Sequence, residues 1–328
     1  MITYIIRRCL LAIPTLLGIS IIGFIIIQLP KGDYLDRKIQ QLEEEYGDSS
    51  SLARVEELRV RYGLDKPMWV RYLKWISGFL RGDFGESFEY EREVSELIWD
   101  RLVFTVMISI GSLIFTYIIA IPLGIYSATH QYKWSDNLLT FLSFVGMSLP
   151  AFLVALAFMV FMFEIFGVPL FGLFSSYYEG APWTYGKFID LLKHLWIPVI
   201  VVGLNGTAAL LRIMRGNLLD MLGQPFVQTA RAKGLKESVV IVKHAVRIAI
   251  NPLISILGMS LPGILSGATI VSIVLGLPTV GPLLLRSLLN EDIYLAGTMI
   301  VMISALLVVG NLLADIALAW ADPRIRYD

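Results

Sequence analysis

Residues Cys9 to Leu29 read CLLAIPTLLGISIIGFIIIQL, a run of 21 residues without a single charge. A helix needs about 20 apolar residues to cross a bilayer, so this run predicts a membrane span. The run is longer than the apolar part of a signal peptide, and no small-residue cleavage site follows it. We therefore expect an uncleaved first helix.

Five further apolar runs follow, from about Leu102 to Ala128, Leu138 to Phe163, Leu195 to Leu211, Pro252 to Leu275, and Tyr294 to Trp320. Backbone polar groups cannot stay unpaired in hydrocarbon, and these runs lack strict alternation, so helices are expected. The sequence thus predicts an all-α membrane protein with six transmembrane helices. Internal prolines such as Pro150 are compatible with membrane helices, because neighbouring helices satisfy the freed carbonyls.

Composition agrees with a membrane protein and argues against an enzyme. Of the 328 residues, 56% are hydrophobic and 16% charged, and the mean hydropathy is +0.70. Soluble domains carry about 25% charged residues. Cys9 is the single cysteine, which excludes a disulfide framework within the chain and a cysteine metal cluster. Neither a phosphate-binding loop nor a His-Glu-x-x-His pattern occurs. We expect no catalytic residue, metal site, cofactor or nucleic-acid partner.

Charge segregation predicts the orientation of the chain. With the N-terminus inside, the inner segments hold 12 basic and five acidic residues, whereas residues 30–101 hold 12 basic and 16 acidic ones. Basic residues concentrate on the cytoplasmic side of membrane proteins. We therefore expect both termini in the cytoplasm. The expected divisions are residues 1–29 (N-terminus and first helix), an external segment at 30–101, and a five-helix core at 102–328.

An aromatic stripe marks the external segment. Trp69, Tyr72 and Trp75 fall at helical spacing on one face. Such residues are typical of an interfacial helix that anchors a loop at the membrane surface. The same stripe could be a docking surface for an external partner, and the two interpretations are compatible.

A cytoplasmic loop at about 212–251 carries the expected mechanism. Pro225 suits the first turn of a helix and Gly234 interrupts it, which predicts a short helix from Pro225 to Lys233 and a second from about Lys236. The exposed side of the short helix is expected to present Phe226, Val227 and Ala230 among several cations. From composition alone, an amphipathic helix adsorbed on anionic lipid explains these residues equally well.

The sequence Gln228-Thr229-Ala230-Arg231-Ala232-Lys233-Gly234-Leu235, followed by His244-Ala245-Val246-Arg247, resembles the cytoplasmic loop of binding-protein-dependent ABC permeases. The dipeptide/oligopeptide branch is the most similar. The general motif of the family has Glu-Ala-Ala, three residues, then Gly, and Ala230 and Gly234 are its strict matches here. Other stretches resemble the same branch, in order along the chain: Tyr62–Pro67, Val70–Leu73, Arg81–Phe88, Ile121–Ile125, Ser148–Phe152 and Asp322–Arg326.

The resemblance implies a type I ABC importer permease in the inner membrane. It implies that Gln228, Thr229, Ala230, Arg231, Ala232, Lys233, Gly234 and Leu235 couple the chain to an ATPase, with Ala230 permitting close approach and Gly234 making the bend. It also implies the partners: a second homologous permease, two ABC ATPase subunits that bind ATP and Mg, an extracytoplasmic solute-binding protein, and membrane lipid.

Small residues in the fifth span are candidates for lining the pathway. Ser255, Ser260, Ser266 and Ser272 recur along it around Pro262. Small residues equally permit close packing of helices, so both roles remain open.

Two alternatives concern the function and the solute. A self-contained secondary transporter needs paired intramembrane charges, for which Glu164 and Asp315 are the candidates. Within the ABC interpretation, peptides are the first expected solute and oligosaccharides the second, and the branch also includes nickel transporters.

Overall fold

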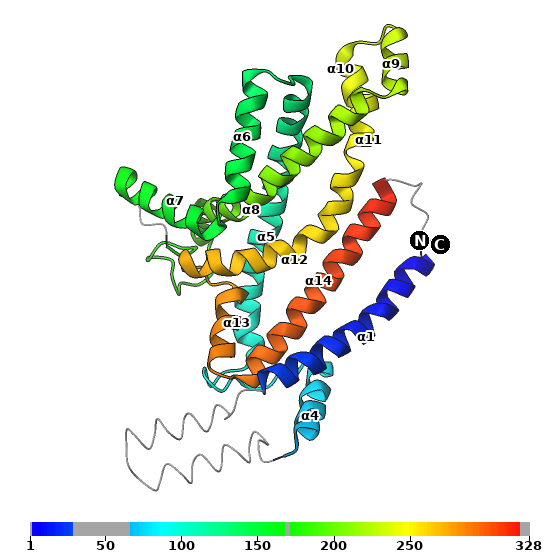
Figure 1. The fold of residues 1–328 in the computed structure, drawn as a ribbon. Helices are drawn as coiled ribbons and strands as arrows, with labels where there is room; N and C mark the ends of the chain where they lie inside the picture. Colours follow the sequence, from blue (N-terminus) through cyan, green and yellow to red (C-terminus); the bar gives the residue numbers. More distant parts are fainter. Residues whose placement is uncertain (1, 29–65, 168–170, 322–328) are drawn as a thin grey trace. The chain divides into compact units, whose positions relative to one another are not determined.

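The computed structural model describes residues 2–28, 66–167 and 171–321, and these ranges are helical apart from loops and one isolated β-bridge, between Glu86 and Glu93 (Figure 1). The chain divides into two compact units, residues 1–103 with 282–308 and residues 104–281 with 309–328. The side chains of residues 258–267 and 313–321 lie outside the described part, as does the external stretch near 40–51.

Within the described residues, four helices are long and apolar enough to cross a membrane. They are α1 (Ile2–Ile27), α5 (Val94–Thr129), α8 (Tyr185–Leu222) and α14 (Ile293–Ala321). Two bent pairs of helices raise the number to six if each pair is one span. The four single helices coincide with the first, second, fourth and sixth predicted spans.

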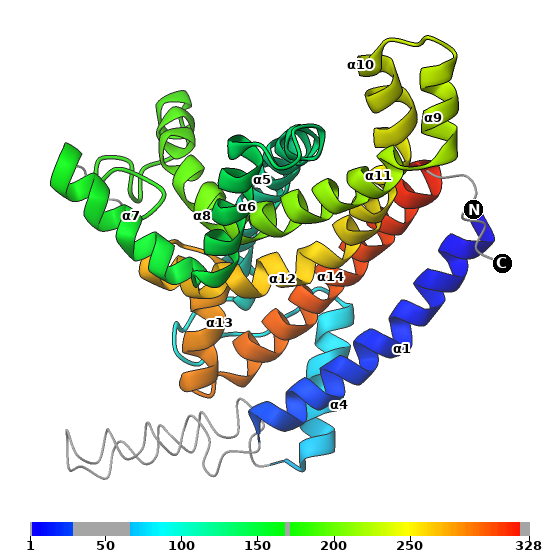
Figure 2. The same cartoon turned by 45° about the horizontal axis from the view of Figure 1, so that its top comes forward.

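The third predicted span is broken, which corrects the expectation of one helix. Helix α6 (Trp134–Ser148) and helix α7 (Ala151–Phe166) meet at 104°. Pro150 lacks an N–H and disfavours helical geometry at the residue before it, and Leu149 accordingly has an extended ψ of 125°. Figure 2 shows α7 turned away from the direction of α6.

The fifth span is α12 (Asn251–Val274), close to the predicted bounds, with Pro252 in its first turn. A π-helical segment, η1 (Val240–Val246), and the short α11 (Arg247–Ala249) lead into it at an angle of 42°. Helix α13 (Val280–Leu289) is a shorter apolar helix that follows α12.

Two of the three aromatic residues of the external segment pack inside the first unit. Helix α4 (Met68–Leu80) places Trp75 against Phe24 of α1, with ring centroids 5.7 Å apart, and only 3% of Trp75 is exposed. Tyr72 contacts the same Phe24 ring edge-on at 5.4 Å. Trp69 alone of the three is largely exposed. The stripe thus anchors α4 to α1.

Asp292 joins two distant parts of the first unit. Its carboxylate accepts hydrogen bonds from Ser87 Oγ at 2.5 Å, from the Glu89 backbone N–H at 3.2 Å, and from the Leu295 backbone N–H at 3.1 Å. The last of these bonds caps the N-terminus of α14. Burial raises the pKa of Asp292, although the hydrogen bonds from Ser87 and the backbone oppose that effect.

In the second unit, small residues bring α5 and α8 into close contact. A Cβ added to Gly124 would lie 2.7 Å from Met214, and one added to Gly203 would lie 3.1 Å from the Ser112 carbonyl oxygen. The Thr116 hydroxyl donates to the Gly203 carbonyl at 3.0 Å. Small residues and interhelical hydrogen bonds are the usual basis of helix association in membranes. Glycine at these positions therefore sets the approach of the two helices.

Candidate coupling surface

The predicted bent loop is present in the second unit. Helix α9 (Pro225–Ala232) begins with Pro225 in its first turn, and the next residues turn at Gly234, whose φ is +72°. Helix α10 (Glu237–Val239) follows. Figure 2 shows α9 and α10 side by side beyond the end of α8. The predictions of a short helix, a bend at Gly234 and a second helix are confirmed.

The apolar side of α9 faces inward, which corrects the expectation that it is exposed. Val227 is fully buried and Ala230 is 6% exposed, in a cluster with Leu218 of α8 and with Val240 and Ala245 of η1. Residues three apart on a helix share a face, and this face is covered by the chain itself. Ala230 therefore permits close approach of α9 to the rest of the chain.

The outward side of the loop is polar and cationic. Every residue from Arg231 to Val239 is exposed, and so are Gln228, Thr229 and the ring of Phe226, which is 38% exposed. Lys233, Gly234, Leu235 and Lys236 form the tip of the bend. We call the set made of Phe226 and residues 228–236, apart from the buried Ala230, the elbow surface.

An ion pair bridges the bend. Arg231 Nη2 lies 2.7 Å from Glu237 Oε1, and Arg231 Nε donates to the same carboxylate at 3.2 and 3.3 Å. This hydrogen bonding raises the pKa of Arg231. The sequence analysis treated Arg231 as a cation that meets a partner, but in the structure its charge is paired with the carboxylate of Glu237. The exposed positive charge of the elbow surface therefore comes from Lys233 and Lys236.

Helices α9 and α11, on either side of the elbow surface, are attached to α8. The Asn217 side chain donates to the Ala249 carbonyl at 3.3 Å, and Leu218 belongs to the same buried cluster as Val227. Helix α8 has 38 residues, which at 1.5 Å per residue is about 57 Å. This length exceeds the ~30 Å hydrocarbon core. Helix α9 thus packs against the end of one long continuous helix.

A buried ion pair ties α8 to α6. Asp136 is 1% exposed, and its two carboxylate oxygens accept from Arg215 Nε at 2.7 Å and Arg215 Nη2 at 2.8 Å. Ser127 Oγ and the Tyr132 backbone N–H also donate to this carboxylate. A carboxylate with four donors, two of them from one guanidinium, is a well-satisfied buried charge. Sequence reasoning missed this pair, because its members are 79 residues apart.

The predicted pathway serines do not form one surface among the described side chains. Ser255 is exposed and its hydroxyl donates to the Asn251 carbonyl at 3.3 Å. Ser272 is 1% exposed and lines a small cavity of about 10 Å³ with Thr105 and Thr279. The side chains of Ser260 and Ser266 lie outside the described part. A role in lining the pathway stays a prediction.

The two intramembrane acids do not form a described pair. Glu164 is exposed near the end of α7, and the side chain of Asp315 lies outside the described part of the chain.

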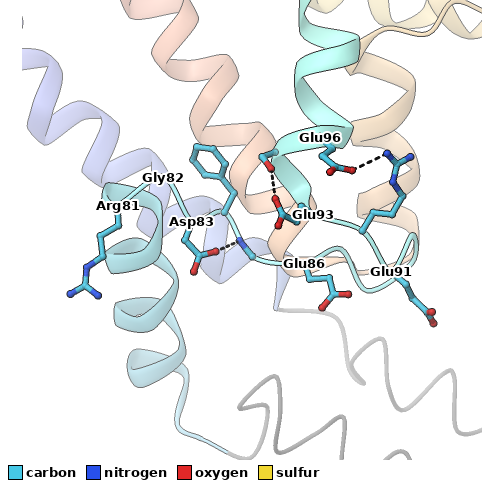
Figure 3. Close-up of a pocket in the computed structure, with 11 residues that line it drawn as sticks. Arg81, Gly82, Asp83, Glu86, Glu91, Glu93 and Glu96 are labelled. Carbon is cyan, nitrogen blue, oxygen red and sulfur yellow. Dashed lines mark hydrogen bonds and ion pairs between the residues drawn. The ribbon is translucent and has the colours of Figure 1, made fainter. Parts of the chain in front are cut away.

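A second feature, absent from the sequence predictions, is an acidic hollow of about 780 Å³ in the first unit (Figure 3). Its lining includes Arg81, Asp83, Glu86, Glu91, Glu93 and Glu96. Asp83 accepts from the Gly85 N–H at 3.0 Å, and Arg92 pairs with Glu96 at 2.9 Å. Carboxylates outnumber guanidinium groups on this lining, so it favours cationic groups.

The helical architecture of the described residues, with four helices long and apolar enough to cross a membrane, is that of a multi-pass membrane protein. The chain belongs to the family described as "Binding-protein-dependent transport system inner membrane component", which matches residues 120–327. Residues 1–109 match the N-terminal region of the same kind of component. These matches confirm the resemblance to ABC permeases and the type I importer fold.

Three relatives that match over nearly the full length of both chains are transport permeases. The chain is 37% identical to the "Oligopeptide transport system permease protein AppB" of Bacillus subtilis (strain 168), with 100% of both chains covered. It is 30% identical to the "Dipeptide transport system permease protein DppB" of Escherichia coli (strain K12), covering 100% of this chain and 99% of the relative. It is also 30% identical to the "Glutathione transport system permease protein GsiC" of Salmonella paratyphi A, again with 100% of both chains covered.

Proposed function

We propose that this chain forms half of the translocation pathway of an ATP-driven importer of peptides. The named relatives are permeases for an oligopeptide, a dipeptide and glutathione, which favours peptides over oligosaccharides or nickel as the solute. A second homologous permease forms the other half. Two separate ABC ATPase subunits bind and hydrolyse ATP, and an extracytoplasmic binding protein delivers the solute.

The observation that carries the proposal is the elbow surface at the end of α8. The apolar residues Val227 and Ala230 of α9 are used for packing, so the polar side is left for a partner. The elbow lies on the side with the excess of basic residues, which is the cytoplasmic side by the charge rule. An ATPase groove that accepts it needs an acidic rim for Lys233 and Lys236 and an apolar depression for Phe226.

The mechanism follows from the connections of the elbow. Closure of two ATPase subunits on ATP moves α9. The shared cluster with Leu218 passes this movement to α8, and the Arg215–Asp136 pair extends it to α6. Because protein interiors are close-packed, these helices move as a block rather than deforming. The binding protein releases its solute into the route when the block opens outward.

Charge reversal tests the proposal. The double variant Lys233→Glu and Lys236→Glu should lose ATPase subunits during purification and lose ATP-dependent peptide uptake in reconstituted vesicles. Lys193→Glu is the matched control, because Lys193 is an exposed lysine in the N-terminal part of α8. Unchanged ATPase binding and uptake in the double variant would refute the coupling role. Peptide uptake by the permease without any ATPase would refute the ATP-driven class.

A further inference from the structure

The segment between the elbow surface and α12 has two distinct sides. Val240, Ala245 and Ala249 are buried in the cluster that also holds Val227 of α9. The opposite side is exposed and carries two cations and three β-branched residues: Val239, Val242, Lys243, Arg247 and Ile248. We call these five residues the η1–α11 face.

The π-helical geometry of η1 brings the two cations together. Hydrogen bonds in a π-helix join residues five apart, so residues four or five apart lie nearly above one another. Lys243 and Arg247 are four residues apart, whereas Val240 and Ala245, five apart, are both buried on the other side. Neither cation takes part in the ion pairs of the described residues. The face therefore presents two adjacent positive charges with no described counter-charge.

The start of α12 sets the depth of this face. Arg247 precedes Asn251, the first residue of α12, by four residues, which is about 6 Å at 1.5 Å per residue. The headgroup layer on each side of the ~30 Å hydrocarbon core is about 5–7 Å thick. The apolar run of the fifth span begins at Pro252. Arg247 thus lies at the depth of the lipid headgroups, with Lys243 one turn nearer the cytoplasm.

A second marker gives the same depth. The Asn217 side chain donates to the Ala249 carbonyl at 3.3 Å, which sets α11 level with this part of α8. Two residues before Asn217, Arg215 pairs with Asp136 at the start of α6. Trp134, the first residue of α6, is 78% exposed, and exposed Trp side chains concentrate at the membrane–water boundary. Both markers place α11 at the inner boundary of the membrane.

The chemistry of the face suits an anionic lipid. The cytoplasmic leaflet is negatively charged and attracts basic segments next to a membrane span. Val242 is 63% exposed and Ile248 is 44% exposed beside the two cations. Exposed apolar side chains next to cations are typical of a helix that lies among lipid headgroups. Helix α9 lacks this combination, because the chain itself covers its apolar side.

We propose that the η1–α11 face binds the headgroup phosphate of an anionic lipid in the inner leaflet. Lys243 and Arg247 donate to the phosphate, while Val242 and Ile248 contact the upper part of the acyl chains. The bound lipid steadies the junction that joins the elbow surface to α12. This assignment is independent of the proposed transport of peptides, because it requires only the depth and the charges of the face.

The test identifies the lipid next to one labelled position. In a Cys9→Ser background, Val242→Cys carries a fluorophore, because Val242 is the most exposed apolar residue of the face. The complete complex is placed in phosphatidylcholine bilayers that contain equal amounts of nitroxide-labelled phosphatidylglycerol or nitroxide-labelled phosphatidylcholine, with the nitroxide near the headgroup. Phosphatidylglycerol should quench the fluorophore more strongly. High salt should reduce this preference, because ions screen exposed charges.

Substitutions at the cations measure their share of the preference. Lys243→Gln and Arg247→Gln should lower the preference for phosphatidylglycerol about fivefold for each cation removed. The charge-retaining exchange of Lys243→Arg with Arg247→Lys should keep it. Lys133→Gln is the matched control, because Lys133 is an exposed lysine at the same boundary, just before α6, and lies outside the face.

Each contrary result overturns the assignment. Equal quenching by the two lipids would show ordinary lipid contact without a headgroup site. Quenching by neither lipid would show that a second permease or an ATPase subunit covers the face. An unchanged preference in the double Gln variant, or an equal loss in Lys133→Gln, would show that Lys243 and Arg247 do not form the site. Loss of peptide uptake in any of these bilayers would bear on the proposed function alone.

Discussion

Replacing Gly234 tests whether the bend itself is required for coupling. Gly234 has a φ of +72°, and a Cβ built on it meets no atom within 4 Å. The cost of a side chain is therefore conformational rather than steric. For alanine in this left-handed region the cost is about 1–2 kcal/mol, whereas asparagine tolerates the region and a β-branched residue is disfavoured further. Gly234→Asn, Gly234→Ala and Gly234→Val should thus weaken the bend increasingly in that order.

The assay is the binding of ATPase subunits to the purified permease pair, followed by ATP-dependent uptake in vesicles. A loss of about 1–2 kcal/mol lowers the ratio of bent to unbent forms about 5- to 30-fold, so Gly234→Ala should weaken ATPase binding by up to that factor. Gly216 on α8 is the matched control, because its Cβ would also meet nothing within 4 Å but its backbone is helical. Gly216→Ala should leave binding intact and favour the helix. Equal binding by all three Gly234 variants and wild type would refute the reasoning.

Three further predictions concern ion pairs and a buried acid. Arg231→Glu and Glu237→Arg should each weaken ATPase binding, and the double exchange should restore it because the ion pair across the bend is rebuilt; additive losses in binding assays would contradict this. Arg215→Met should destabilise the second unit by about 3 kcal/mol, because it leaves the buried Asp136 carboxylate without its guanidinium, and thermal unfolding in detergent measures this loss. Burial raises the pKa of Asp292, so the folded state holds this proton more tightly than the unfolded chain. The contribution of Asp292 to stability is therefore full below pH about 4 and is lost as pH rises through the folded-state pKa. Asp292→Asn should flatten that part of the unfolding profile, and an unchanged slope would contradict the assignment.

Local sequence signals predicted the elbow well. Helix α9 begins at Pro225, as predicted, and ends at Ala232, one residue before the predicted end, with the bend at Gly234. Proline and glycine act through their own backbone geometry, which is independent of the rest of the fold. The spans other than the third were predicted equally well, because membrane helices are recognised by their length and hydropathy.

Packing contacts between helices that are distant in sequence could not be predicted from the sequence alone. Val227 and Ala230 look like an exposed apolar side until η1 covers them. The stripe of Tyr72 and Trp75 gives no sign that Phe24 of α1 is the residue it packs against. In both cases the local pattern indicates the face of the helix correctly, but what covers that face is decided by tertiary packing.

The break at Pro150 could not be predicted either, for a different reason. A proline inside an apolar run is compatible with a continuous membrane helix and with a break. The choice depends on whether neighbouring helices satisfy the freed backbone groups, and the sequence does not identify those neighbours. The structure places a 104° bend there.

The position of the elbow surface relative to the membrane and the ATPase is the central claim, and one labelling experiment tests it. Cys9 is the single cysteine, so a Cys9→Ser background allows Lys233→Cys to be labelled alone with a membrane-impermeant maleimide. We predict no labelling from the outer side. From the cytoplasmic side we predict slow labelling with ATPase subunits bound and fast labelling once they are stripped. Labelling from the outer side, or an equal cytoplasmic rate with and without the ATPase, would contradict the claim.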